Sequence, residues 1–245
     1  MRETTEILGV PIDIISHASV LDRLEQFMSE GGFHLVVTPN PEMITLAKKD
    51  ARINEILRSA ALAAPDGIGV VMASKLTNKP IKERVTGCEL MPDLLGRMAK
   101  SGKTAYFLGG KPGVADLAKA KMEARYPGVK IIGARHGYFK PDDDKLIREE
   151  LRAKKPDLLL LGLSMGMALN WAYDHKDLDV PVTACVGGTL DILSGEVARA
   201  PAFFRKFGLE WFYRLISEPQ RAGRMLQLPV FAAMALREKF TGQSS

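Results

Sequence analysis

The residues best suited to chemistry follow short apolar stretches, at points where the chain turns toward a predicted helix. Asp66 stands in the segment APDGIGVV, directly before a glycine. A carboxylate at such a position caps the N-terminus of a helix, or it acts as a general base that takes the proton from an attacking hydroxyl. Position alone leaves both interpretations of Asp66 open.

Three further polar residues have the same double interpretation. Thr38 and Asn40 flank Pro39 at the end of an apolar run, where the fixed φ of proline would hold both side chains toward a pocket. An Asn-Pro turn that opens the next helix explains the same two residues. Arg84, in KERVTG, pairs with a phosphate charge or lies on the surface, and without other information the surface is the simpler interpretation.

Two apolar runs end in paired glycines, Gly109-Gly110 in LGGKPG and Gly187-Gly188 in VGGTLD. Glycine lets an anion approach the unpaired N–H groups at a helix start, so both turns suit a diphosphate. Each turn also has a structural interpretation, in which glycine only makes a tight connection between strand and helix. Neither reproduces G-x-G-x-x-G, which weakens a dinucleotide interpretation.

A metal site is not expected. The Asp-x-Asp pairs at 142/144 and 177/179 are better explained by helix capping and by a polar loop. The four histidines have no metal-ligand spacing, and the two cysteines, Cys88 and Cys185, are too few and too far apart for a disulfide framework or a zinc site. They fit reduced thiols in the cytoplasm.

A parallel sheet would bring these loops together. Apolar runs alternate with helical patterns, and the runs predicted as strands cover residues 33–38, 104–109, 129–134, 157–163 and 182–186. Continuous runs such as LLLLGL are typical of strands buried on both faces. The alternation predicts an open, mostly parallel, Rossmann-like α/β sheet flanked by helices, and ligands of such sheets lie outside the carboxyl ends of the strands. For one flanking helix, Ser19 followed by Asp22 predicts a capping box, and Gly31 predicts the end.

Composition predicts one α/β core at residues 1–195 and a basic, amphipathic helical appendage at residues 196–245. The chain has 245 residues, of which 46% are hydrophobic and 26% charged, which excludes a disordered or fibrous protein. The net charge is +5, and residues 196–240 hold eight Lys or Arg against four Glu, so the basic excess lies in the tail. The N-terminus lacks the basic segment and long apolar run of a secretory signal, so we expect a cytoplasmic protein.

The tail mixes aromatic and basic residues between Phe203 and Ile216, a pattern typical of a helix at a membrane interface and also of a helix docked on the core. The apolar run at residues 226–236 is shorter than the roughly 20 residues that span a bilayer, so we expect the protein to lie on a membrane surface. Basic residues mixed with aromatics, beside a nearly neutral remainder, argue against nucleic-acid binding.

Several segments, taken in order, resemble the WecG/TagA/CpsF family of bacterial glycosyltransferases: VVTPNPEMI, APDGIGVV, ERVTG, FLGGKPGVA, YPGVKIIG, HGYF, VGGTLDILSG and RAPAFFRKFGLEWFYRLISEPQRAGR. The resemblance covers residues 7–224. It implies an inverting, metal-independent transfer of an N-acetylmannosamine-type sugar from UDP to an undecaprenyl-diphosphate-linked sugar. The reaction would serve cell-surface polysaccharide or teichoic acid synthesis at the inner face of the membrane.

The resemblance also assigns roles. Asp66 resembles the family's proposed base, and Thr38, Asn40 and Arg84 match its pocket residues. The donor nucleotide is expected at a set of loop residues: Gly109, Gly110, Tyr138, Gly187, Gly188 and Asp191. The acceptor diphosphate is expected at three tail arginines: Arg214, Arg221 and Arg224.

One segment departs from the family. Members commonly read G-[LA]-G-x-P-K-Q-E-x-W, whereas this chain reads GLSMGMALNW at residues 162–171, so that Ala168 and Leu169 replace Gln and Glu. Two alternatives follow: an active transferase with a retuned donor, or a catalytically silent, membrane-associated scaffold. A nicotinamide-dependent oxidoreductase, suggested only by the alternating pattern, lacks the fingerprint. The sequence leaves a homo-oligomer open.

Overall fold

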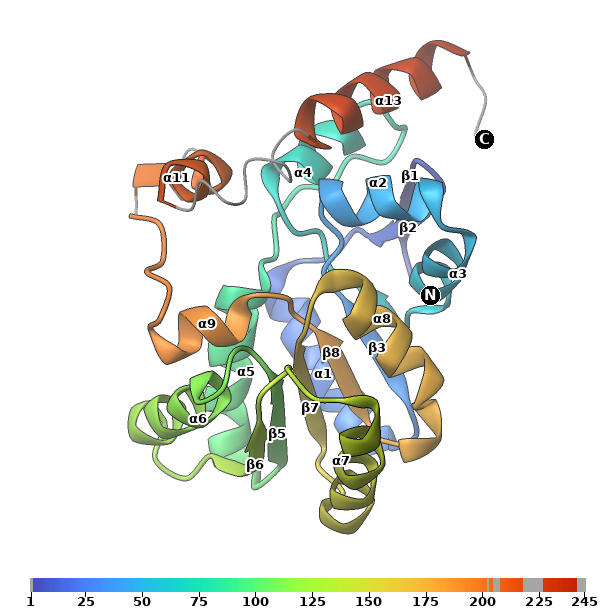
Figure 1. Ribbon diagram of the computed structural model, residues 1–245. Helices are drawn as coiled ribbons and strands as arrows, with labels where there is room; N and C mark the ends of the chain where they lie inside the picture. Colours follow the sequence, from blue (N-terminus) through green and yellow to red (C-terminus); the bar gives the residue numbers. More distant parts are fainter. Residues whose placement is uncertain (1, 202, 205–207, 218–226, 242–245) are drawn as a thin grey trace.

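Among the residues that the computed structural model describes, six parallel strands form the central sheet, in the order β4-β3-β8-β7-β5-β6 (Figure 1). The structure describes residues 2–201, 203–204, 208–217 and 227–241. The strands are β3 (His34–Val37), β4 (Leu62–Ala63), β5 (Thr104–Gly109), β6 (Lys130–Arg135), β7 (Leu158–Gly162) and β8 (Val182–Cys185). The predicted open, Rossmann-like α/β sheet is confirmed. A short antiparallel pair, β1 (Thr4–Ile7) and β2 (Val10–Asp13), precedes it.

Helices cover both faces of the sheet. One face packs against α1 (His17–Glu30), α5 (Gly87–Ser101), α6 (Val114–Arg125) and α9 (Thr189–Ser194). The other packs against α2 (Pro41–Lys49), α3 (Ala51–Ser59), α7 (Pro141–Lys154) and α8 (Met165–Asp174). A 3-10 turn, η1 (Lys176–Leu178), follows α8.

Strand β7 explains why the apolar runs are continuous. Leu158 and Leu160 enter the core on the α1 and α5 side, whereas Leu159 and Leu161 enter the core on the α2 and α8 side. All four are buried, and each buried leucine stabilises the fold by about 1.5–3 kcal/mol. Both cores therefore depend on the same short strand.

The predicted start of α1 was wrong by one turn. Ser16, not Ser19, is the N-cap, and its Oγ accepts a hydrogen bond from the Ser19 backbone N–H at 3.2 Å. Ser19 lies inside the first turn, where its own N–H needs such an acceptor. The predicted end at Gly31 is confirmed, because this residue has φ 72 and caps the helix.

The C-terminal helices lie at the end of the molecule that carries α2 and α4 (Ile68–Ser74) (Figure 1). They are α11 (Glu210–Ser217) and α13 (Gln227–Thr241). Helix α13 packs on α2 and α4 and buries Phe231 and Ala235 in the core. In the described part of the chain, no helix is long and apolar enough to cross a membrane. The boundary at residue 195 stays a prediction.

Candidate active site

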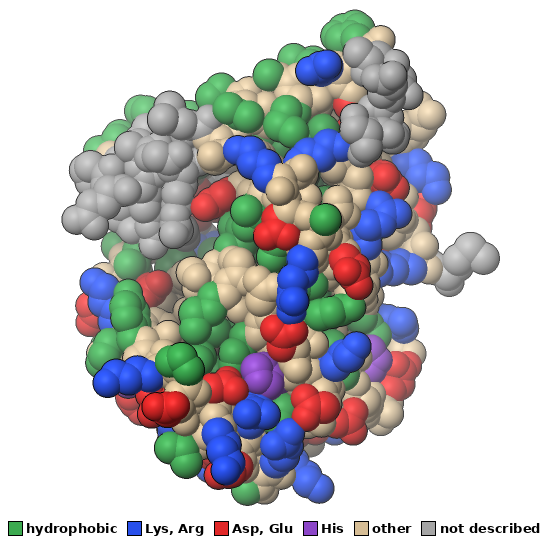
Figure 2. Space-filling model, turned by 45° about the vertical axis from the view of Figure 1, so that its right-hand side comes forward, with side chains coloured by type: hydrophobic (Ala, Val, Ile, Leu, Met, Phe, Trp, Pro, Cys, Tyr) green, Lys and Arg blue, Asp and Glu red, His purple; other side chains and the backbone are tan. Residues whose placement is uncertain are grey.

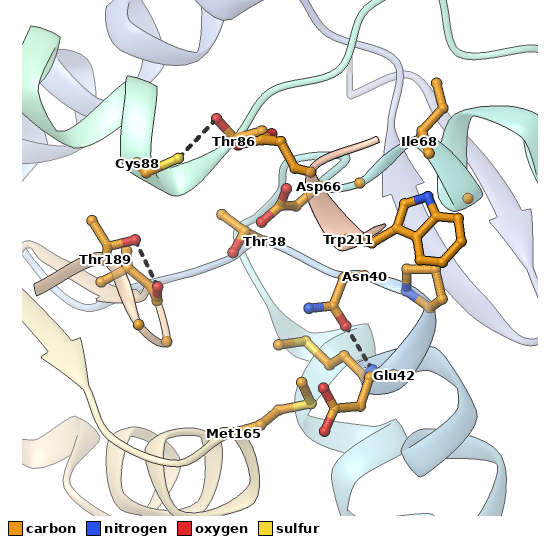
Figure 3. Close-up of a pocket in the computed structure, with 18 of the residues that line it drawn as sticks. Thr38, Asn40, Glu42, Asp66, Ile68, Thr86, Cys88, Met165, Thr189 and Trp211 are labelled. Carbon is orange, nitrogen blue, oxygen red and sulfur yellow. Dashed lines mark hydrogen bonds between the residues drawn. The ribbon is translucent and has the colours of Figure 1, made fainter. Parts of the chain in front are cut away.

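A cavity of about 250 Å³ lies at the carboxyl ends of the adjacent strands β4, β3, β8 and β7 (Figure 3). The loops after these strands, together with the first turns of the helices that follow them, form most of its wall. The segment before α5 and the starts of α11 and α13 complete it. The position is the one that the open parallel sheet predicts for a ligand site.

Asp66 and Thr38 lie together because two neighbouring strands end beside each other. Ala64 N donates to Val37 O at 2.9 Å, and Asp66 N donates to Pro39 O at 3.1 Å, so the segments after β4 and β3 run side by side. Figure 3 shows the Asp66 carboxylate pointing into the cavity toward the Thr38 hydroxyl. The N-cap of α4 is Gly67, with φ 88, so Asp66 precedes the cap position.

Asn40 satisfies both of its interpretations. Its Oδ1 accepts a hydrogen bond from Met43 N at 2.9 Å and thereby caps α2, as an Asn-Pro turn predicts. Its amide nitrogen points into the cavity (Figure 3). One side chain therefore fixes the helix start and directs a hydrogen-bond donor into the cavity.

Arg84 lines the cavity and is not a surface residue. Its Nη1 donates to Glu210 Oε2 at 2.8 Å, and the two side chains are only 18% and 14% exposed. Glu210 is the first residue of α11, so this ion pair joins the C-terminal region to the cavity wall. In the part of the chain that the structure describes, Arg84 is the only Lys or Arg that lines the cavity.

A polar network that sequence reasoning missed continues from Arg84. Thr86 Oγ1 donates to Glu89 Oε2 at 3.0 Å, and Arg199 forms an ion pair with the same carboxylate. Burial alone would raise the pKa of Glu89, but the hydrogen bonds from Thr86 and Arg199 outweigh it and lower the pKa below its ordinary value. Burial also raises the pKa of the Cys88 thiol, which lines the cavity. The position of Thr86, two residues after Arg84 in the sequence, was the one signal that could have indicated this network.

Two of the predicted donor residues lie at the cavity. Gly187 and Gly188 follow β8 and line the wall of the cavity, and Gly187 has φ 52, which favours glycine. Thr189, for which the sequence predicted no role, lines the cavity wall beside them and donates its hydroxyl to Val186 O at 2.8 Å.

The other predicted donor residues do not line this cavity. A Cβ on Gly109 would lie 2.4 Å from the carbonyl carbon and oxygen of Gly162, so this glycine allows two strand ends to touch. Gly110 N donates to Gly162 O at 3.0 Å in the same contact. Tyr138 is 69% exposed, and Asp191 lies in the first turn of α9. Their proposed roles with a nucleotide stay predictions.

The predicted binding of the acceptor diphosphate by three tail arginines, and the predicted absence of a metal, stay predictions. Arg214 belongs to α11, but its side chain is not described, and Arg221 and Arg224 lie outside the described residues. Among the residues that the structure describes, no three His, Cys, Asp or Glu side chains are grouped to hold a metal ion.

The segment that departs from the family forms an apolar wall. Ala168 lines the cavity, while Leu169 is fully buried in the core behind it. Met165, at the start of α8, also faces the cavity (Figure 3). Helix α8 therefore presents no hydrogen-bonding side chain at these two cavity positions.

Comparison with known proteins gives a consistent result. The model of the Glycosyl transferase WecG/TagA/CpsF family matches residues 5–245. The N-acetylglucosaminyldiphosphoundecaprenol N-acetyl-beta-D-mannosaminyltransferase of Bacillus subtilis (strain 168) is 34% identical over 239 residues, which cover 97% of this chain and 93% of the relative. The protein of the same name in Staphylococcus aureus (strain MW2) is 29% identical over 229 residues, which cover 92% and 89%.

Proposed function

Since the chain belongs to the WecG/TagA/CpsF family of glycosyl transferases, we propose that it transfers an N-acetylmannosamine-type sugar from UDP, with inversion, to an undecaprenyl-diphosphate-linked sugar. The names of the two relatives support the acceptor and the sugar. We place the reaction at the inner face of the membrane in cell-surface polysaccharide or teichoic acid synthesis. The protein would be cytoplasmic and peripheral to that membrane.

The observation that carries this proposal is the Asp66 carboxylate in a cavity that also contains Arg84. Asp66 takes the proton from the acceptor hydroxyl while the oxygen of that hydroxyl attacks the anomeric carbon of the donor. The bond from that carbon to the diphosphate oxygen breaks, and UDP leaves with the electron pair. General-base catalysis of this kind contributes about 10²- to 10⁴-fold in rate.

The leaving diphosphate needs positive charge. Arg84 supplies it, and the planar guanidinium fits phosphate oxygens. The Asn40 amide and the Thr38 hydroxyl are the nearby groups that would orient the sugar. No metal is needed in this scheme.

The test is incubation of the full chain with a short-chain GlcNAc-diphosphate-prenyl acceptor and a panel of UDP-sugars, with products weighed by mass spectrometry. Asp66→Asn is expected to lower turnover by about 10²- to 10⁴-fold. It should leave the thermal midpoint close to that of the unaltered chain, and it should not weaken UDP binding. Near-normal turnover would remove Asp66 from the role of base.

A second candidate is a catalytically silent, membrane-associated scaffold, favoured by the apolar Ala168 in the cavity wall. The same experiment separates the two. Failure to make product with every UDP-sugar, together with absence of UDP binding in calorimetry, would support the scaffold.

A further inference from the structure

Helix α13 has two different sides. Phe231 and Ala235 are buried against the core, and Leu8 N donates to Glu238 Oε2 at 3.1 Å, which turns the helix's only acidic side chain inward. The opposite side exposes apolar and basic side chains: Val230, Leu236, Arg237, Lys239 and Phe240, the last of them 82% exposed. Figure 2 shows hydrophobic side chains beside Lys and Arg at this end of the molecule.

The end of α4 and the segment after it also expose apolar and basic side chains. Met72 is 61% exposed, and Lys75, Lys79 and Lys82 are exposed after it. The chain folds around the end of α4, because Ile81 is buried and its N–H donates to Ser74 Oγ at 2.8 Å. Residues 68–82 contain these three lysines and no Asp or Glu.

The two segments adjoin each other. Helices α4 and α13 are in contact, and a Cβ on Gly69 would lie 3.8 Å from the Leu228 side chain (Figure 1). Ile68 and Gly69 of α4 and Leu228 of α13 also line the cavity. The exposed surface therefore begins where the cavity wall ends.

We propose that this surface, made of residues 72–82 and the outer side of α13, seats the protein on an anionic lipid bilayer with the cavity beside the headgroups. Exposed Met72, Leu236 and Phe240 would enter the interface, and the lysines would meet lipid phosphates. The inference rests on the proposed function, which supplies a lipid-linked acceptor. It assigns part of the membrane contact to residues 72–82 of the α/β core, in addition to the basic tail.

Charge reversal tests the core half of the surface. The triple variant Lys75→Glu, Lys79→Glu and Lys82→Glu is compared with a matched control, Lys121→Glu, Lys130→Glu and Lys145→Glu, whose lysines are also exposed but lie on α6, β6 and α7. Full-length proteins are floated with vesicles of 70% phosphatidylcholine and 30% phosphatidylglycerol, proportions of roughly physiological charge. Each basic residue near such a surface contributes about a five-fold factor, so the first triple should partition at least about 100-fold less. The control should change by less than about ten-fold, because salt screens distant charges.

Activity separates failure of this surface from failure of the proposed function. With a water-soluble short-chain acceptor, both triple variants should match the unaltered chain. With acceptor embedded in vesicles, only the first triple should lose product. If no protein makes product with either acceptor, the proposed function fails, while flotation still decides on the surface.

Met72→Asp, with Leu117→Asp on α6 as the matched control, tests the apolar part; both side chains are exposed. Met72→Asp should weaken flotation and the control should not. Unchanged flotation of the first lysine triple or of Met72→Asp would overturn the proposal. The same variants are sedimented without lipid. If they have a different mass from the unaltered chain while their flotation is unaffected, a second copy covers this surface, and that result too would overturn the proposal.

Discussion

Glu210→Gln should tighten UDP binding, because Glu210 forms an ion pair with Arg84, the residue that we propose binds the diphosphate of the donor. Arg84 Nη1 lies 2.8 Å from Glu210 Oε2, and both side chains are mostly buried. A diphosphate that binds Arg84 must compete with this carboxylate. Glutamine keeps the shape of the side chain and removes its charge, so the competition weakens while α11 retains a hydrogen-bonding partner.

The magnitude follows from the ion pair. At about 4 Å and an effective dielectric constant of about 20, two unit charges attract by about 4 kcal/mol before the cost of desolvating them is subtracted. A charged hydrogen bond has a net worth of about 1.5–3 kcal/mol. Part of this is regained when glutamine replaces glutamate, so we expect a gain of about 1.4 kcal/mol, or ten-fold in the dissociation constant of UDP.

Titration calorimetry with UDP measures this directly. Glu196→Gln is the control, because it changes the same charge at an exposed position. Fluorescence of Trp211, which lines the cavity beside Glu210, reports whether α11 stays in place. UDP affinity that is equal or lower in Glu210→Gln, with unchanged Trp211 fluorescence, would refute the competition between carboxylate and diphosphate.

Three further predictions concern single residues. Asn40→Ala removes the cap of α2 and should lower the free energy of unfolding, measured in urea, by about 1 kcal/mol. Asn40→Asp should keep this stability and weaken UDP binding, because it adds a negative charge to the cavity. Gly109→Ala should lower the free energy of unfolding by more than about 3 kcal/mol, because its Cβ would clash with the Gly162 backbone. Gly113 has φ 86 and open space around it, so Gly113→Ala should lower the free energy of unfolding by only about 1–2 kcal/mol. Equal losses would contradict the close contact between Gly109 and Gly162. Burial alone would raise the pKa of Asp157, but hydrogen bonds from Thr104 and Lys103 lower it, so its stabilisation is present above the unfolded pKa and is lost as pH falls through the folded pKa. Asp157→Asn should therefore cost about 2 kcal/mol at pH 7, and unfolding curves should show the difference shrinking below about pH 4.

The sheet could be predicted because burial on both faces leaves a local mark. The runs around β5 and β7 are continuously apolar, and their predicted limits differ from the observed ones by at most one residue. Strand β4, Leu62–Ala63, has two residues and leaves too short a pattern to recognise. Its length is set by pairing with β3, which is a long-range interaction.

Strand order explains which predicted site residues meet. Asp66, Thr38 and Gly187 follow β4, β3 and β8, which are neighbours in the sheet, so their loops share one cavity. Gly109 and Tyr138 follow β5 and β6, beyond β7. The glycine turns at 109 and 187 look alike in the sequence, and local pattern carries no information on strand order, so the two could not be separated.

The contact between Arg84 and Glu210 lies beyond sequence reasoning for a different reason. The two residues are 126 positions apart, and each has a sufficient local explanation. A carboxylate in the first turn of α11 complements the positive end of that helix, and an arginine in KERVTG is ordinary on a surface. A residue that satisfies a local rule gives no sign of a second, long-range role. The ion pair between Glu210 and Arg84 therefore becomes visible only when α11 is placed against the cavity.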